Sequence, residues 1–289
     1  VYLHGCNQTP QDAAVGTRWN TVGEAKGMIV VYPEQPAGFT SNSNAAHCWN
    51  FFDPTQQNRG QGEPAIIAGI TRHVISTWKV DPKRVYVIGA SAGAAEAEVL
   101  GAAYPDLYAS IGSVAGCPYA ACSDVTGALT YRAMGSNARQ VPAFIAHGTS
   151  DEVTVYPLGE AEVQQWLGAD DLADDGLLNG SVSRIPASFE NFGFTTPPNP
   201  GSGDPCIVPV AGPYDRVPCA GGVAGFQGTY PYTIRHYNDA TGHSLLDFYT
   251  IYGLGHAYPG GNPSGSFVDP LGPDVTTAAA NFFMAHPKP

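Results

Sequence analysis

Short runs of consecutive apolar residues alternate along the chain with segments whose apolar positions recur every three or four residues. The first pattern is typical of buried strands and the second of helices. The expected strands are residues 1–3, 28–32, 85–88, 110–115, 141–146 and 246–252, and the expected helices are residues 10–26, 63–78, 94–104 and 274–285. This alternation predicts an α/β fold with a mainly parallel, doubly wound sheet flanked by helices.

The segment around Ser91 provides the first hypothesis about chemistry. An uncharged, mostly β-branched run at 85–88 is followed at once by Gly89-Ala90-Ser91-Ala92-Gly93, which fits G-x-S-x-G, and then by an alanine-rich segment. A strand, this pentapeptide and a helix form the context of a nucleophile elbow, in which the two glycines leave room for a tight turn. A chance cluster in a chain with 35 glycines is the alternative. The flanking strand and helix favour the elbow, with Ser91 as the nucleophile.

A nucleophilic serine needs a base, and the base needs a carboxylate that orients it. In a fold with such an elbow, the acid and then the histidine come later in the chain than the serine, on loops after later strands. Asp151 is the candidate acid because it lies just past the expected strand 141–146, with its neighbour Glu152 as the alternative. His256 is the candidate base because it lies in a glycine-rich loop directly after the expected strand 246–252.

Two backbone N–H groups are needed to stabilise the oxyanion that forms during acyl transfer. Ala92 should supply one, because it is the residue after the nucleophile, and Cys6 should supply the other from the loop after the first strand. Trp49, Tyr119 and Tyr258 are candidates for lining the substrate cleft. For each of these three aromatic residues, ordinary core packing is an equally good interpretation.

Composition narrows the class of protein. Charged residues make up only 13% of the chain, and the formal net charge is −12. A negative chain of this kind is a poor partner for nucleic acid or for an anionic membrane surface. No stretch is long and apolar enough to be inserted into a bilayer. The chain begins inside an expected strand, so we interpret it as a mature or trimmed product.

Six cysteines, an even number, indicate disulfide bonds and an oxidising compartment. Fifteen pairings are possible in principle. Pairing between neighbours would join Cys6 to Cys48, Cys117 to Cys122 and Cys206 to Cys219. We expect residues 1–289 to form one catalytic domain, with a loop-rich excursion, pinned by a disulfide, at about 191–228.

Several motifs resemble the secreted poly(3-hydroxybutyrate) depolymerase family. Besides the Ser91 elbow, they lie at residues 3–9, 31–35, 48–52, 81–87, 147–151 and 255–261. The resemblance implies an α/β-hydrolase fold, secretion, and hydrolysis of short-chain polyhydroxyalkanoate esters without a metal or organic cofactor. It also implies a catalytic triad of Ser91, His256 and Asp151, with the oxyanion held by Cys6 and Ala92. Tyr258 stands where the family commonly has tryptophan.

The leading hypothesis is therefore a secreted serine esterase that acts on a polyester or a small ester. A feruloyl or acetylxylan esterase is the alternative among enzymes, because such esterases are related to this family. A hydrolase fold used only for binding is the alternative from another class. That interpretation predicts the loss of a triad residue, and all three candidate residues are present.

Overall fold

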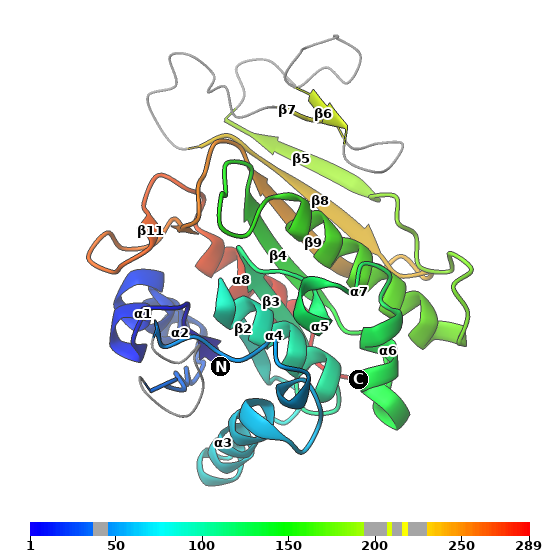
Figure 1. Ribbon diagram of the computed structural model, residues 1–289, viewed down its shortest axis with the longest axis horizontal. Helices are drawn as coiled ribbons and strands as arrows, with labels where there is room; N and C mark the ends of the chain where they lie inside the picture. Colours follow the sequence, from blue (N-terminus) through cyan, green and yellow to red (C-terminus); the bar gives the residue numbers. More distant parts are fainter. Residues whose placement is uncertain (37–45, 194–206, 210–215, 219–229) are drawn as a thin grey trace.

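The computed structural model describes residues 1–36, 46–193, 207–209, 216–218 and 230–289. Its main sheet has seven strands in the order β1-β2-β3-β4-β9-β8-β5 (Figure 1). Their bounds are Tyr2–Leu3 (β1), Tyr86–Ala90 (β2), Ser110–Val114 (β3), Ala143–Gly148 (β4), Ser244–Ile251 (β9), Tyr232–Asn238 (β8) and Ser188–Phe192 (β5). The strands from β1 to β9 in this order run parallel, and β8 and β5 continue the sheet in antiparallel pairing. The mainly parallel sheet expected from the sequence is confirmed.

Helices cover both faces of the sheet (Figure 1). One apolar core lies under α1, α2 and α8, and the other lies under α3, α4, α6 and α7. The bounds are Pro10–Thr17 (α1), Trp19–Lys26 (α2), Gly62–Trp78 (α3), Ala92–Ala103 (α4), Tyr119–Cys122 (α5), Ala128–Met134 (α6), Pro157–Asp175 (α7) and Val275–Ala285 (α8), with 3-10 turns at Pro54–Gln56 and Gly135–Asn137. Two short sheets join Tyr258–Pro259 (β10) to Val268–Asp269 (β11) and Ile207–Pro209 (β6) to Arg216–Pro218 (β7).

The run around β2 is apolar throughout because both faces of the sheet are covered. Val85 and Val87 belong to the core under α3, α4 and α7, whereas Tyr86 and Ile88 belong to the core under α2 and α8. Side chains alternate between the two faces of a strand, so a central strand of this kind needs apolar residues at every position. Ser91 is the residue that follows the last residue of this strand.

The expected helix at 10–26 is interrupted at Arg18, which adopts a left-handed φ of 64°. The break is held from outside the segment: the Thr276 hydroxyl, from α8, donates to Thr17 O (2.5 Å). After the turn, Trp19 stacks on Phe283 of α8. The prediction of one helix was wrong because a distant side chain binds the carbonyl at which the helix breaks.

Two other expectations about strands need correction. Residues 28–32 run beside β1 but are not part of the sheet, and their backbone link to it is the hydrogen bond from Tyr2 N to Val31 O (2.8 Å). The antiparallel strands β8 and β5, which extend the sheet beyond β9, were not expected. Most of the excursion expected at about 191–228, including Cys206 and Cys219, lies outside the described residues.

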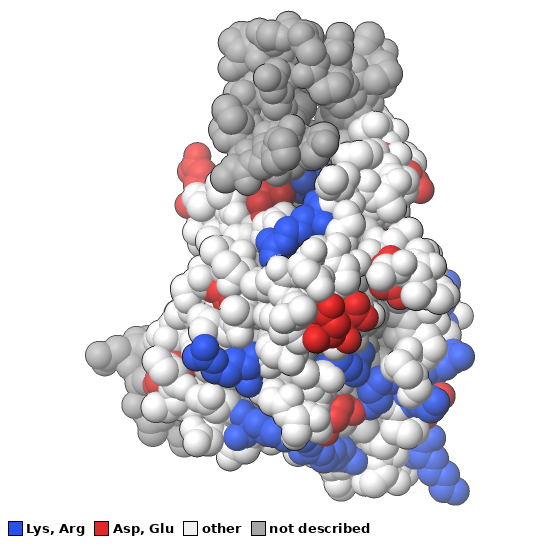
Figure 2. All heavy atoms as spheres, turned by 90° about the vertical axis from the view of Figure 1, so that its right-hand side faces the viewer, with Lys and Arg blue, Asp and Glu red and all other residues white. Residues whose placement is uncertain are grey.

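Charged residues make up only 13% of the chain. On the face shown in Figure 2, Lys, Arg, Asp and Glu are scattered over a mainly uncharged surface. Within the ranges given above, no helix is both long and apolar enough to cross a membrane.

A pair of buried carboxyl groups lies between α4 and α7. Glu98 Oε2 accepts hydrogen bonds from Gln165 Nε2 and Trp166 Nε1 (both 2.7 Å), and Glu162 Oε1 accepts one from the Ser113 hydroxyl (2.5 Å). Burial raises the pKa of both carboxyls, and the nearby charge of Glu162 raises that of Glu98 further. The folded protein therefore retains protons here that the unfolded chain releases.

This pair predicts that the protein loses stability as the pH rises. An acid with a raised pKa in the folded state stabilises the fold below its unfolded pKa and loses that contribution as the pH rises through its folded pKa. One retained proton gives a slope of about 1.4 kcal/mol per pH unit. Melting temperatures measured between pH 5 and 9 should fall less steeply for Glu98→Gln than for the wild type. An equal slope in Glu98→Gln would contradict this prediction, and exposed Glu152→Gln is the control.

Candidate active site

Ser91 occupies a strained turn between β2 and α4. Its φ and ψ are 55° and −123°, and its N–H donates to Val114 O (2.9 Å). A Cβ on Gly89 would lie 2.1 Å from Gly93 O, and a Cβ on Gly93 would lie 2.2 Å from Leu3 O. Both glycines are therefore required by close backbone contacts, one within the turn and the other between α4 and β1. This geometry is that of the elbow expected from the sequence pattern.

The loops after β4 and β9 bring Asp151 and His256 to Ser91. His256 Nε2 lies 2.9 Å from Ser91 Oγ, and His256 Nδ1 lies 2.8 Å from Asp151 Oδ2. An ionised carboxylate only accepts hydrogen bonds, so Nδ1 carries the ring proton and Nε2 is free to accept the proton of the serine. The side chain of Glu152, the alternative acid, is exposed to solvent.

The Asp151 carboxylate is buried, and its oxygens accept hydrogen bonds from protein donors. Its Oδ1 accepts hydrogen bonds from the N–H groups of Val153 and Thr154 (both 2.9 Å). Burial opposes its ionisation, but the hydrogen bonds from His256 and from Val153 N–H outweigh burial and hold its pKa below the ordinary value. Asp151 is therefore an anion across the neutral and mildly acidic range.

The N–H groups of Cys6 and Ala92 are the expected oxyanion donors. Among the described residues, neither donates to a protein acceptor. Cys6 lines the same pocket as Ser91 and His256, and Ala92 is the first residue of α4. The N–H of Ala92 lies at a helix N-terminus beside the nucleophile, where it suits a developing negative charge.

Gln8 holds the loop that carries Cys6. Its Oε1 accepts from Gly5 N (2.9 Å), while its Nε2 donates to Asp12 Oδ2 and Ser266 O (both 3.0 Å). Ser266 in turn donates from its N–H to Asp12 Oδ1 (2.9 Å). The loop after β1 is thereby tied to a loop near the end of the chain. The Gly5 N–H is occupied, so of these two N–H groups only that of Cys6 has no acceptor among the described residues.

A disulfide also joins Cys6 to Cys48, and a second joins Cys117 to Cys122. The remaining two cysteines lie outside the described ranges. Within those ranges, no group of three His, Cys, Asp or Glu side chains is placed to hold a metal ion.

The pocket at Ser91 has a volume of about 260 Å³. Its walls include the apolar side chains of Val114, Val153 and Phe267, together with Tyr258, one of the three aromatic candidates. No Lys, Arg, Asp or Glu among the described residues lines it. An uncharged pocket of this size suits a small, neutral group beside the serine.

Trp49 and Tyr119, the other two aromatic candidates, do not line this pocket. Trp49 is buried and donates from its indole N–H to His4 O (2.9 Å). Tyr119 is buried, and its hydroxyl donates to Gln57 O (3.0 Å). Both residues pack in the core, and their polar groups are used to hold neighbouring loops.

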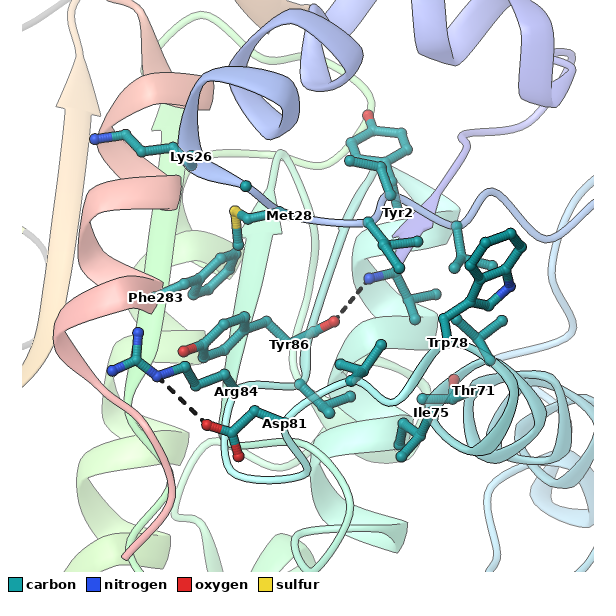
Figure 3. Close-up of a pocket in the computed structure, with 18 of the residues that line it drawn as sticks. Tyr2, Lys26, Met28, Thr71, Ile75, Trp78, Asp81, Arg84, Tyr86 and Phe283 are labelled. Atoms are coloured by element: carbon teal, nitrogen blue, oxygen red, sulfur yellow. Dashed lines mark hydrogen bonds and ion pairs between the residues drawn. The ribbon is translucent and has the colours of Figure 1, made fainter.

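A larger groove, of about 470 Å³, lies beside β1, between residues 26–31 and the C-terminal end of α3 (Figure 3). Trp78, Tyr86 and Phe283 line it, and its charged groups include the ion pair between Arg84 and Asp81. Among the described residues that line it, none is a nucleophile with an adjacent base. We therefore place the candidate site at Ser91, where polar groups converge, although the groove is larger.

Gln8, Thr154 and Phe267 are among the residues of the site that were not expected from the sequence. Thr154 had a local signal, because an aspartate commonly accepts from N–H groups two and three residues later. Gln8 had none for its link to the distant loop, because its bond to Ser266 O spans 258 residues, and Phe267 had none because it reaches the pocket from that same loop.

Sequence comparison finds several proteins that are similar to this chain. It is 30% identical over 260 residues to poly(3-hydroxyalkanoate) depolymerase C of Paucimonas lemoignei, a match that covers 90% of this chain and 54% of that protein. It is 30% identical over 193 residues to a probable acetylxylan esterase A of Aspergillus fumigatus, covering 58% of this chain and 50% of that protein. The chain thus spans about half the length of the curated relatives it matches.

Comparison with solved structures and with protein families agrees with these relatives. The acetyl xylan esterase from Aspergillus awamori superposes with a TM-score of 0.60 at 20% identity, covering 88% of this chain and 82% of that chain. This likeness confirms the α/β-hydrolase fold. Residues 1–168, more than half of the chain, match the family described as esterase PHB depolymerase. The chain therefore belongs to the esterase PHB depolymerase family.

Proposed function

We propose that this protein is a serine esterase with Ser91 as nucleophile, His256 as general base and Asp151 as the residue that orients the histidine. The observation that carries the proposal is the continuous chain of contacts from Ser91 Oγ through the imidazole to Asp151 Oδ2, of 2.9 and 2.8 Å. Serine, base and carboxylate in this arrangement are the elements of acyl transfer.

In the first step, Ser91 Oγ attacks the ester carbonyl carbon and His256 Nε2 takes the hydroxyl proton. The carbonyl oxygen becomes an oxyanion, which the N–H groups of Cys6 and Ala92 stabilise. His256 then gives the proton to the leaving alcohol. A water molecule, activated by the same histidine, hydrolyses the acyl-enzyme and regenerates Ser91. Asp151 keeps Nδ1 protonated throughout and stabilises the imidazolium.

We propose short-chain polyhydroxyalkanoates, above all poly(3-hydroxybutyrate), as the substrates. Support comes from the family and from the depolymerase that aligns with 90% of the chain. The uncharged pocket of about 260 Å³ agrees with a small acyl group that carries no charge. Two disulfides support export to an oxidising compartment, where a solid polyester would be met.

The test is the clearing of a turbid suspension of poly(3-hydroxybutyrate) by the purified protein, with release of 3-hydroxybutyrate measured in the supernatant. We expect clearing by the wild type and none by Ser91→Ala. Acetylated xylan and methyl ferulate are assayed in parallel, because acetylxylan and feruloyl esterases are also among the relatives. Release of acetate or ferulate without clearing would exclude the polyester and favour a plant-wall esterase.

A further inference from the structure

Thr154 lies where three loops of the site meet, and each of its polar groups has a partner there. Its N–H donates to Asp151 Oδ1 (2.9 Å), and its carbonyl oxygen accepts from His147 Nε2 (2.6 Å). Its hydroxyl oxygen lies 2.8 Å from Ala115 O, 3.0 Å from Asp151 Oδ2 and 3.2 Å from His256 Nδ1. The residue therefore links the loops that follow β3, β4 and β9.

A hydroxyl suits the position of Thr154, which lies between two acceptors, Ala115 O and Asp151 Oδ2, and one donor, His256 Nδ1–H. A hydroxyl has one proton and two lone pairs. Ala115 O and the ionised Asp151 Oδ2 only accept, so the proton of Thr154 goes to one of these two oxygens. A lone pair then remains to share the Nδ1–H of His256, whose shorter contact is to Asp151 Oδ2. When the proton goes to Asp151 Oδ2, the hydroxyl binds the carboxylate and the imidazole together. When it goes to Ala115 O, the hydroxyl holds the imidazole to that backbone, and the Thr154 N–H still holds the carboxylate at Oδ1.

The Ala115 acceptor is itself held in place. Ala115 has a left-handed φ of 51°, which a residue with a side chain keeps only where its surroundings impose it. Its N–H donates to Ala146 O (2.9 Å), and the carbonyl of the preceding residue, Val114, accepts from Ser91 N. The Thr154 hydroxyl is therefore anchored to the same stretch of backbone that positions the nucleophile.

We propose that Thr154 is a positioning residue, whose hydroxyl holds Asp151 and His256 in the mutual orientation that proton transfer from Ser91 requires. The inference rests on the proposed function. It assigns to a fourth side chain the task of keeping the histidine ring aligned while the ring gains and loses a proton at Nε2.

The experiment compares Thr154→Val, which keeps the shape of the side chain without the hydroxyl, with Thr154→Ser, which keeps the hydroxyl. A hydrogen bond to a charged group corresponds to about a 10- to 100-fold effect on a rate. On p-nitrophenyl butyrate, Thr154→Val should lose about that factor in kcat with KM unchanged, and Thr154→Ser should stay close to the wild type. Wild-type kcat in Thr154→Val, equal losses in both variants, or a loss confined to KM would overturn the inference.

Labelling by a fluorophosphonate separates this inference from the proposed function. The rate at which Ser91 is labelled depends on the serine and its base and not on the natural substrate. No labelling of the wild type would contradict the proposed function itself. Labelling of the wild type and Thr154→Val at the same rate would contradict only the role of Thr154, and slower labelling of Thr154→Val alone would support it.

Discussion

Replacing Ser91 with alanine is expected to lower kcat for ester hydrolysis by about 10⁴- to 10⁶-fold. The loss is large because the base and the carboxylate act only through the serine, so without it they no longer accelerate the reaction. The fold should remain intact, since the backbone contact that holds the turn, from Ser91 N to Val114 O, does not involve the side chain. Turnover of p-nitrophenyl butyrate and the melting temperature of the same preparation measure the two effects.

The matched control is Ser136→Ala, an exposed serine in the 3-10 turn Gly135–Asn137, which should keep wild-type kcat. Mass spectrometry after reaction with a fluorophosphonate should place the label on the peptide that contains Ser91. Turnover by Ser91→Ala at more than about a hundredth of the wild-type rate would mean that another group is the nucleophile.

Gly93→Ala should destabilise the protein strongly although it adds a single methyl group. The new Cβ would lie 2.2 Å from Leu3 O and 2.5 Å from His4 O, which are backbone atoms that cannot rotate away. Helix α4 would have to move from β1, and overpacking of this kind costs about 3 kcal/mol or more of the free energy of unfolding. Urea denaturation followed by circular dichroism measures the loss.

Gly69→Ala provides the comparison for this variant. Gly69 lies on the exposed side of α3, and a Cβ there meets no atom within 4 Å. Alanine is favoured over glycine in a helix by about 1 kcal/mol, so this variant should be as stable as the wild type or more stable. Similar stabilities for Gly93→Ala and Gly69→Ala would show that α4 and β1 are not in close contact.

The central strand and the turn that carries Ser91 were predicted correctly, because the residues that cause them lie within the segment itself. The apolar run before Gly89 is a central strand because both of its faces are buried, and G-x-S-x-G marks the turn because two backbone contacts exclude a Cβ. The break at Arg18 was not predictable, because the group that binds the carbonyl there comes from Thr276. Long-range partners of this kind leave no pattern in the segment that they alter.

In the candidate site too, some residues could be predicted from the sequence and others could not. Ser91, Asp151 and His256 were expected from their places after predicted strands, because parallel strands present their carboxyl ends at one edge of a sheet. The roles of Trp49 and Tyr119 were not predictable, because an aromatic residue near a motif packs equally well in a core or in a cleft. The structure places both in the core, where their polar groups bind backbone carbonyls.

The order of the strands has a consequence for when the proposed active site is complete. Ser91 and His256 are 165 residues apart, and the loop that carries the histidine is in place only after β9 has inserted between β4 and β8. Contacts between such distant residues form late in folding, because closing a long loop costs entropy before the contacts are gained. Until its C-terminal part has folded, the chain therefore lacks the contact between Ser91 and His256, and the hydrolytic activity proposed above arises only at the last stage of folding.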